Sequence, residues 1–404
     1  MLMIPEIRIA DYIYELPEGR IAQYPLEKRD ESRLLVYKAG KISDDKFYSL
    51  PSWLQPNSLL IFNNTRVIKA RLLFRKESGA AIEIFCLEPF DPSDYALTFS
   101  SPVPVVWKCL AGNLRRWRSG PVYLKFHLGG KEHVLKAEKL GAENKDLLVR
   151  FSWDVPGMVF SEVLEAAGHV PLPPYIGRSD EPSDIGRYQT IYSDINGSVA
   201  APTAGLHFTP TVFESLAKSD ISVDYLTLHV GAGTFLPVKS ELISSHEMHA
   251  EHFQVSSGTI RNLLAKRGSV IAVGTTSART LESLYWLGIK LLRDPVQDYG
   301  EFFIDQWDPY KEQVDVPIEK ALGCLLDFMN KKGLDSINAS TRLIIVPGYR
   351  FRVVSGLVTN FHQPGSTLLL LVSAFTGQNW KVIYEHALKN GYRFLSYGDS
   401  SLLI

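Results

Sequence analysis

The stretch Val270-Ile271-Ala272-Val273-Gly274-Thr275-Thr276-Ser277-Ala278-Arg279 predicts a buried strand, a tight turn and the first turn of a helix. Four successive apolar residues are typical of a strand that is covered on both faces. The turn offers hydroxyl groups and free backbone N–H groups at a helix N-terminus, where a carboxylate or phosphate is stabilised. Arg279 adds a bidentate contact to such a ligand, or else it pairs with Glu282 on a plainly capped helix.

Similar units recur on both sides of this stretch. Further buried strands are expected at residues 58–62, 223–229, 343–346 and 357–359. Helices with recognisable ends lie between them: Thr209 can cap a helix whose first residue is Pro210, and Gly391 can end a helix over 380–390. This alternation predicts an α/β main domain, with a mixed, largely parallel sheet and helices on both faces.

The region between residues 67 and 153 has a different pattern. Short runs of alternating apolar and polar residues are separated by glycine-containing turns, at roughly 8–12 residue spacing. This pattern predicts a small antiparallel β-barrel without helices, inserted into the main domain. The expected domains are therefore 1–66 together with 154–404, and 67–153.

Residues 288–340 form a second distinct region, with ten acidic and six basic residues, a net charge of −4. We expect this acidic insert to be an added surface subdomain of the main domain.

Composition limits the class of protein. The 404 residues include 43 basic and 44 acidic residues, so a polyanion has to be held by a local patch. Three cysteines without a CxxC motif predict a reduced protein without structural disulfides. No apolar run approaches the ~20 residues that span a bilayer, and no secretory signal is visible. We expect a cytoplasmic protein with no membrane partner.

A glycine-rich turn follows the strand expected at 223–229. Gly231 and Gly233 form a G-x-G pair, but Pro237 stands where a helix would have to begin, and no third glycine follows. A dinucleotide fingerprint needs that helix N-terminus for its phosphates. The glycines therefore predict only that a ligand approaches the backbone closely.

The segment 246–252 contains three histidines, at positions 246, 249 and 252. The metalloprotease motif requires histidines at i and i+4, but position 250 is alanine, and the spacing i, i+3, i+6 does not share one helical face. We expect no metal site. A loop histidine used for acid–base chemistry and a solvated polar stretch remain the two alternatives.

Two further polar loops each contain a histidine, His207 in 200–208 and His362 in 359–367. A lone histidine is more often structural. However, five polar or glycine-rich segments (200–208, 228–234, 246–252, 274–279 and 359–367) lie at the ends of expected strands, where open α/β sheets bind ligands. We interpret them as one site.

Basic residues cluster in and beside the expected barrel. One run extends from Arg66 to Lys76, and another, from Lys108 to Arg118, is accompanied by Trp107 and Trp117. Basic residues interleaved with tryptophan suit phosphates and unstacked bases. Solvated barrel strands are the alternative.

Several of these segments match one family. The motifs are Tyr-Glu-Leu-Pro at 14–17, Asn-Asn-Thr-Arg-Val at 63–67, Gly-His-Val-Pro-Leu-Pro-Pro-Tyr-Ile at 168–176, Pro-Thr-Ala-Gly-Leu-His-Phe at 202–208 and Asn-Phe-His at 360–362. In this set and order the chain resembles the S-adenosylmethionine:tRNA ribosyltransferase-isomerase family of queuosine biosynthesis.

The resemblance implies an α/β domain with an inserted barrel, and a specific reaction. The ribosyl part of S-adenosylmethionine would be transferred to the aminomethyl group of a deazaguanine at the tRNA wobble position. Rearrangement of the ribose would give epoxyqueuosine, with release of adenine and methionine. S-adenosylmethionine is then a substrate, no cofactor or metal is expected, tRNA is the partner, and we expect a monomer.

The reaction needs proton transfers and groups that hold both substrates. The expected catalytic residues are His207, His229, His249, His362, Glu251 and Asp399. The expected substrate-binding residues are Thr203, Gly205, Gly231, Gly233, Thr275, Thr276, Arg279, Asn360 and Tyr397. The expected tRNA-binding residues are Arg66, Lys69, Arg71, Arg115, Arg116 and Arg118.

Two other classes of protein are alternatives. An S-adenosylmethionine-dependent RNA methyltransferase is disfavoured because no glycine-rich turn leads into a helix. A non-catalytic RNA-binding protein is disfavoured because five strand-end segments with histidines or glycines are more than passive binding requires.

Overall fold

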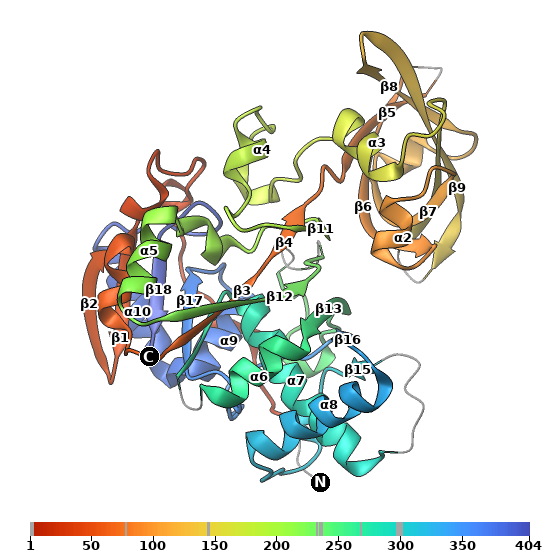
Figure 1. Ribbon diagram of the computed structural model, residues 1–404. Coiled ribbons are helices and arrows are strands. Elements are labelled where there is room, and N and C mark those ends of the chain that lie inside the picture. Colours follow the sequence, from red (N-terminus) through yellow and green to blue (C-terminus); the bar gives the residue numbers. More distant parts are fainter. Residues whose placement is uncertain are drawn as a thin grey trace.

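A ten-stranded sheet organises the main domain (Figure 1). The structure, a computed structural model, describes residues 4–76, 79–143, 146–231, 233, 237–266, 269–295 and 302–404. The central strands β12, β3, β14 and β17 are mutually parallel, whereas antiparallel pairs occur toward both edges. The expected mixed, largely parallel sheet is confirmed. In sheet order the strands are β15 (Phe302–Ile304), β16 (Ser336–Thr341), β13 (Glu251–Ser256), β12 (Ser222–Leu228), β3 (Leu59–Asn63), β14 (Val270–Val273), β17 (Gly356–Asn360), β18 (Ser400–Leu403), β1 (Arg33–Lys38) and β2 (Lys41–Lys46).

Both faces of this sheet are covered, as continuous apolar strands require. Successive side chains of a strand point to opposite faces. In β3, Leu59 and Ile61 belong to the core formed with α6, α7, α9 and α10, whereas Leu60 and Phe62 belong to the core formed with α1 and α5. The helices of the main domain are α1 (Leu50–Trp53), α4 (Asp184–Arg187), α5 (Pro210–Lys218), α6 (Ser257–Ala265), α7 (Thr275–Arg293), α8 (Ile318–Lys332), α9 (Thr367–Thr376) and α10 (Trp380–Lys389).

Local signals set several boundaries as expected. The Thr209 side chain accepts a hydrogen bond from Val212 N at the start of α5, and Gly391 follows the end of α10 with a φ of +77°.

The strand expected at residues 343–346 was wrong. Residues 343–346 are buried but extended without strand partners, because their backbone groups bond to side chains such as Thr341 and Tyr310.

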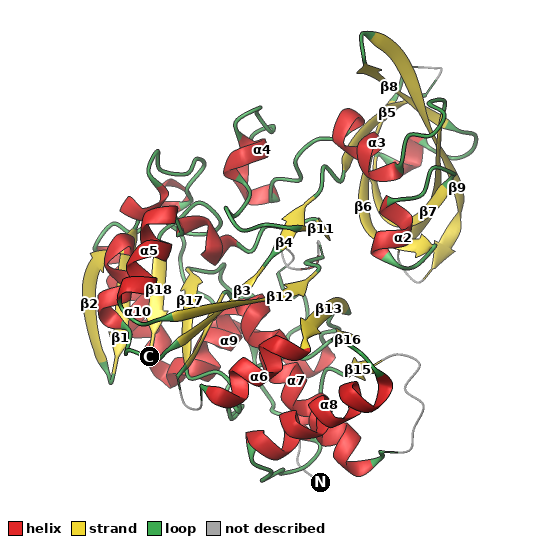
Figure 2. Ribbon diagram, in the orientation of Figure 1, coloured by secondary structure: helices red, strands yellow, loops and turns green. Residues whose placement is uncertain are grey.

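The inserted region forms a closed six-stranded barrel in the order β10-β7-β6-β5-β8-β9. It stands apart from the sheet in Figure 1, and the short pair β4 (Thr65–Val67) and β11 (Ile195–Ser198) lies between the two. Figure 2 shows that two short helices, α2 (Tyr95–Phe99) and α3 (Phe160–Ala167), accompany the barrel strands. The expectation of no helix between 67 and 153 was therefore wrong for α2. The barrel strands are β5 (Arg71–Arg75), β6 (Ala81–Asp91), β7 (Val105–Gly112), β8 (Val122–Leu128), β9 (Lys131–Glu143) and β10 (Asp146–Trp153).

The acidic stretch 288–340 is part of the main sheet. It supplies the edge strands β15 and β16 and the helix α8, while residues 296–301 lie outside the described part. Phe302 and Tyr310 are buried in the main core. Helix α8 packs closely on α7 at Gly288. A side chain at this position would collide with the carbonyl group of Ala321. The stretch is thus built into the core of the main domain.

Among the described residues, no helix combines the length and apolar character needed to cross a membrane.

Candidate active site

An open cavity of about 690 Å³ lies where the parallel strands end. This edge of an open α/β sheet is where ligands bind. The cavity brings four of the five expected segments together. Its lining includes residues 200–204, 230, 274–276 and 359–363.

The N-terminus of α7 opens onto this cavity. Gly274 precedes the helix with a φ of +92°, and no side chain caps the first turn. Thr275 and Thr276 line the cavity, whereas Ser277 turns its hydroxyl group back to Val273 O at 2.8 Å. The first-turn N–H groups of a 19-residue helix therefore face a hollow that can hold an anion.

Glu251 and Arg279 form a buried ion pair behind this wall. Glu251 also accepts a hydrogen bond from Gly231 N at 3.2 Å, which ties the segment 246–252 to the glycine-rich turn. Burial lowers the pKa of Arg279 to about 10. The guanidinium group of Arg279 contacts Glu251 and does not pair with Glu282. Arg279 is also not among the residues that line the cavity. Ala232 and residues 234–236 of the turn lie outside the described residues.

His207 lies at the back of the cavity, hydrogen-bonded on both ring nitrogens. Its Nε2 is 3.1 Å from Asn360 Oδ1, and its Nδ1 is 2.8 Å from Ser32 Oγ. The Asn360 amide nitrogen donates to the carbonyl of Leu395, so Oδ1 is the acceptor and Nε2 carries the proton. Burial lowers the pKa of His207 to about 4, so the ring is neutral at pH 7.

His362 is the expected proton-transfer residue that lines the cavity itself. Its Nε2 is 2.9 Å from Thr359 Oγ1, and its backbone N–H donates to Tyr384 Oη. Burial lowers the pKa of His362 to about 3. It is therefore an unprotonated imidazole at neutral pH.

His229 and His249 lie at the contact with the barrel. The His229 ring stacks on Tyr95 of α2, with centroids 4.2 Å apart, and its Nδ1 has no partner among the described residues. Burial and the charge of His252 lower the pKa of His229 to about 4. The His249 ring covers Gly233, where an added Cβ would lie 2.6 Å from Cδ2.

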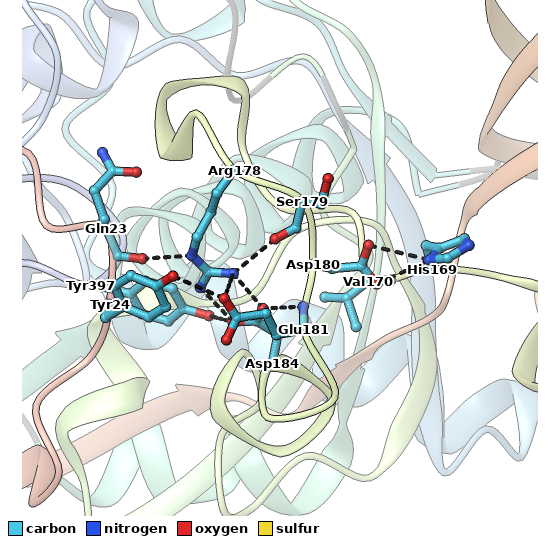
Figure 3. Close-up of polar contacts among 10 residues, drawn as sticks. All are labelled: Gln23, Tyr24, His169, Val170, Arg178, Ser179, Asp180, Glu181, Asp184 and Tyr397. Atoms are coloured by element: carbon cyan, nitrogen blue, oxygen red, sulfur yellow. Dashed lines mark hydrogen bonds and ion pairs between the residues drawn. The ribbon is translucent and has the colours of Figure 1, made fainter.

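Asp399 and Tyr397 lie outside the cavity. Asp399 is buried and accepts hydrogen bonds from the backbone N–H groups of Arg33 and Arg393, at 3.0 and 2.8 Å. Tyr397 donates to Asp184 at 2.9 Å, and Asp184 is held by Arg178 (Figure 3). These contacts fasten loops beside the cavity.

The other expected substrate contacts are divided. Thr203 and Asn360 line the cavity. Gly205 does not, and Tyr192 packs so closely against it that no side chain fits there. Two lining residues were missed: Tyr175 and Ser396 share a hydrogen bond of 2.6 Å across the cavity wall. Tyr175 belongs to the motif at 168–176, which was the available signal for it.

The basic residues expected to bind tRNA differ in availability. Lys69 pairs with Glu165 and Arg71 with Glu83, whereas Arg66 is exposed without an ion pair among the described residues. Arg115, Arg116 and Arg118 are exposed on the turn after β7.

Contrary to expectation, the two tryptophans among the basic residues are not available to bind unstacked bases. Trp107 and Trp117 are fully buried in the barrel core, so neither can stack on a base.

The histidines of the segment 246–252 do not gather into a metal site. Across the described ranges, no three His, Cys, Asp or Glu side chains lie close enough to share an ion. Cys86, Cys109 and Cys324 are free thiols.

A sheet with a ligand cavity at its strand ends, an uncapped helix N-terminus in that cavity and an inserted barrel define an α/β ligand-binding protein of two parts. Comparisons with known proteins narrow this class. The model of a family described as queuosine biosynthesis protein matches residues 9–403. The chain belongs to the queuosine biosynthesis family.

Curated relatives match over almost their whole length. An S-adenosylmethionine:tRNA ribosyltransferase-isomerase of Treponema denticola is 37% identical, covering 98% of this chain and 99% of its own. A protein of the same name from Magnetococcus marinus is 38% identical, with 98% and 94% covered. A solved structure, the S-adenosylmethionine tRNA ribosyltransferase of Thermotoga maritima, is 29% identical and covers 98% of this chain and 100% of its own, with a TM-score of 0.45.

Proposed function

We propose that this protein is an S-adenosylmethionine:tRNA ribosyltransferase-isomerase, acting as a cytoplasmic monomer. It transfers the ribosyl part of S-adenosylmethionine to 7-aminomethyl-7-deazaguanine in the tRNA wobble position and isomerises it, giving epoxyqueuosine, adenine and methionine. The observation that carries the proposal is the strand-end cavity with the open N-terminus of α7, in a chain of the queuosine biosynthesis family.

The α7 N-terminus is the proposed seat of the methionine carboxylate. Its partial positive charge favours an anion, and the hydroxyl groups of Thr275 and Thr276 add donors. The neighbouring backbone at Gly231 and Gly233 and the side chains of Thr203 and Asn360 then border the nucleoside. Arg279 positions this wall through Glu251.

Proton transfer falls to His362 in this proposal, because it alone of the expected acid–base residues in the described chain lines the cavity. The sulfonium of S-adenosylmethionine acidifies the neighbouring C5′ protons, and a neutral imidazole can accept one. With a pKa of about 3, His362 stays unprotonated through the working range. The pH–rate profile therefore has no limb near pH 6.5 that depends on His362. His207, His229, His249, Glu251 and Asp399 remain candidates for positioning roles.

The barrel's exposed arginines are the proposed remote contacts to tRNA. Arg115, Arg116 and Arg118 lie on one turn, and Arg66 lies where the barrel joins the main domain. Their charges attract phosphates without reading sequence.

The proposed reaction is tested by following the ribose. With S-adenosylmethionine carrying ¹³C in its ribose, we expect the label in the modified nucleoside after tRNA digestion. The control carries ¹³C in the methyl group, which is expected to leave with methionine. Label from the methyl group in the RNA would contradict the proposal.

Replacing Thr276 by aspartate is expected to weaken S-adenosylmethionine binding at least about tenfold. A carboxylate in the first turn of α7 competes with, and repels, the methionine carboxylate, at a cost of roughly 1–4 kcal/mol at contact distance. Thr276→Asn, similar in shape but neutral, is the matched control and should lose less than about threefold. Titration calorimetry measures both affinities, and melting temperatures show that both variants are folded. Equal affinities for the two variants would place the carboxylate elsewhere.

A further inference from the structure

A second, smaller cavity of about 280 Å³ lies beside the first. Ser396 lines both cavities. The His207–Asn360 hydrogen bond separates them, because His207 lines the smaller cavity and Asn360 the larger. A ligand that fills the larger cavity therefore lies next to the smaller one.

Three arginines, Arg29, Arg187 and Arg393, line this second cavity, and no carboxylate does. Arg393 pairs with Asp399 behind the wall. Arg29 and Arg187 donate only to backbone carbonyl oxygens, and neither has an ion-pair partner among the described residues. Asp399 thus balances the charge of Arg393, whereas Arg29 and Arg187 bring two positive charges to the lining without an ion-pair partner among the described residues.

These arginines are held in place before any ligand arrives. Asp184 begins the short helix α4 that Arg187 ends, and it is almost fully buried. Arg178 binds both oxygens of Asp184 at 2.7 and 2.8 Å, and Tyr397, which lines the cavity, donates to the same carboxylate (Figure 3). Charges fixed in this way lose little freedom on binding an anion.

We propose that this three-arginine cavity binds a backbone phosphate of the RNA substrate, next to the nucleotide whose base enters the larger cavity. The inference rests on the proposed function, which makes tRNA the acceptor. Arginine binds phosphate oxygens in a bidentate manner, and Ser32 adds a nearby hydroxyl group. The cavity thereby sets the register of the anticodon strand on the active site.

The amino-acid end of S-adenosylmethionine fits this cavity poorly. Its carboxylate is accompanied by an ammonium group and the sulfonium, so its net charge is positive. A cavity with three arginines and no lining carboxylate repels such a group. A phosphodiester has a negative charge only.

The experiment uses Arg187→Gln, which keeps a side-chain donor for the carbonyls of residues 26 and 27 but removes the charge. We expect its dissociation constant for tRNA to rise about tenfold, and the slope of log affinity against log salt to become shallower by about 0.7–0.9. Affinity for S-adenosylmethionine should be unchanged. Arg187→Lys should retain most of the salt slope. Lys320→Gln, which removes an exposed charge on α8, is the control and should match the wild type.

Two results would overturn the inference: a wild-type salt slope in Arg187→Gln, or lost S-adenosylmethionine affinity with intact tRNA binding. Arg29→Gln, which also removes a charge without an ion-pair partner among the described residues, repeats the measurement if Arg187→Gln does not fold. Binding is measured without turnover, so the test is separate from that of the proposed function, whose failure would appear as a wild-type protein that releases no adenine.

Discussion

Replacing Glu282 by alanine is expected to lower the free energy of unfolding by about 4 kcal/mol or more. Glu282 is fully buried in α7 and accepts hydrogen bonds from the backbone N–H groups of Arg352, Val353 and Val354 at 2.9–3.0 Å. It also accepts one from Tyr349 Oη at 2.8 Å. Alanine leaves these four donors without their acceptor, three of them buried, at roughly 1–3 kcal/mol for each buried one.

The same substitution is expected to weaken ligand binding. Residues 352–354 precede β17, and the end of β17 and the start of α7 both line the cavity. Glu282 therefore fixes one wall relative to the other. Tyr349→Phe, which removes a single donor, is the matched control and should cost only about 1–3 kcal/mol. Urea unfolding measures the stability of both variants. A Glu282→Ala midpoint close to that of the wild type would contradict the role of Glu282 as a buried acceptor.

Stability is expected to fall steeply between pH 7 and pH 5. Burial lowers the pKa of His207 to about 4 and that of His362 to about 3, whereas an unfolded histidine titrates near 6.5. Between these values the unfolded chain binds more protons than the native one, so acid favours unfolding. The contribution is fully present above about pH 6.5 and is lost as the pH falls through the folded values.

The size of this effect follows from proton linkage. Each histidine contributes about 1.4 kcal/mol per pH unit at most, so the two together contribute up to about 4 kcal/mol between pH 7 and pH 5. His229, whose pKa is also lowered to about 4, adds to the same slope. Unfolding free energies measured across this range should show a shallower slope in His362→Gln. The exposed His127→Gln should keep the wild-type slope. Equal slopes in all three proteins would mean that the buried rings titrate normally.

The strand-and-turn unit at 270–279 was predictable because every signal is local. An apolar run, a glycine and hydroxyl residues lie in consecutive positions, and the structure has β14 and α7 there. Residues 343–346 have an equally apolar run but are not a strand. Their backbone groups find side-chain partners, including Tyr310 from a segment 36 residues away. Such partners depend on tertiary structure and leave no local pattern.

The buried position of Trp107 could have been predicted from the sequence. Trp107 and Cys109 lie on either side of Lys108 in β7, and alternation in a barrel strand puts every second residue inside. The basic neighbours suggested a surface role that this period excludes for Trp107.

The contacts that shape the site are mostly long-range. The pairing of Arg279 with Glu251, and not with Glu282 one turn away, joins residues from α7 and β13. The three arginines of the second cavity come from three separated segments, at positions 29, 187 and 393. The segments 246–252 and 274–279 were predicted to belong to one site, but only the fold shows which of their side chains meet. No sequence pattern pointed to Arg29, Arg187 or Arg393.

The identity of the small products distinguishes ribosyl transfer from methyl transfer and from RNA binding without turnover. The protein is incubated with S-adenosylmethionine and tRNA carrying 7-aminomethyl-7-deazaguanine, and the small products are separated and quantified. For the proposed reaction we expect adenine and methionine in equal amounts, matching the epoxyqueuosine formed, with no S-adenosylhomocysteine. S-adenosylhomocysteine with methylated RNA would contradict the account and indicate a methyltransferase, and unchanged S-adenosylmethionine beside bound tRNA would indicate a passive RNA-binding protein.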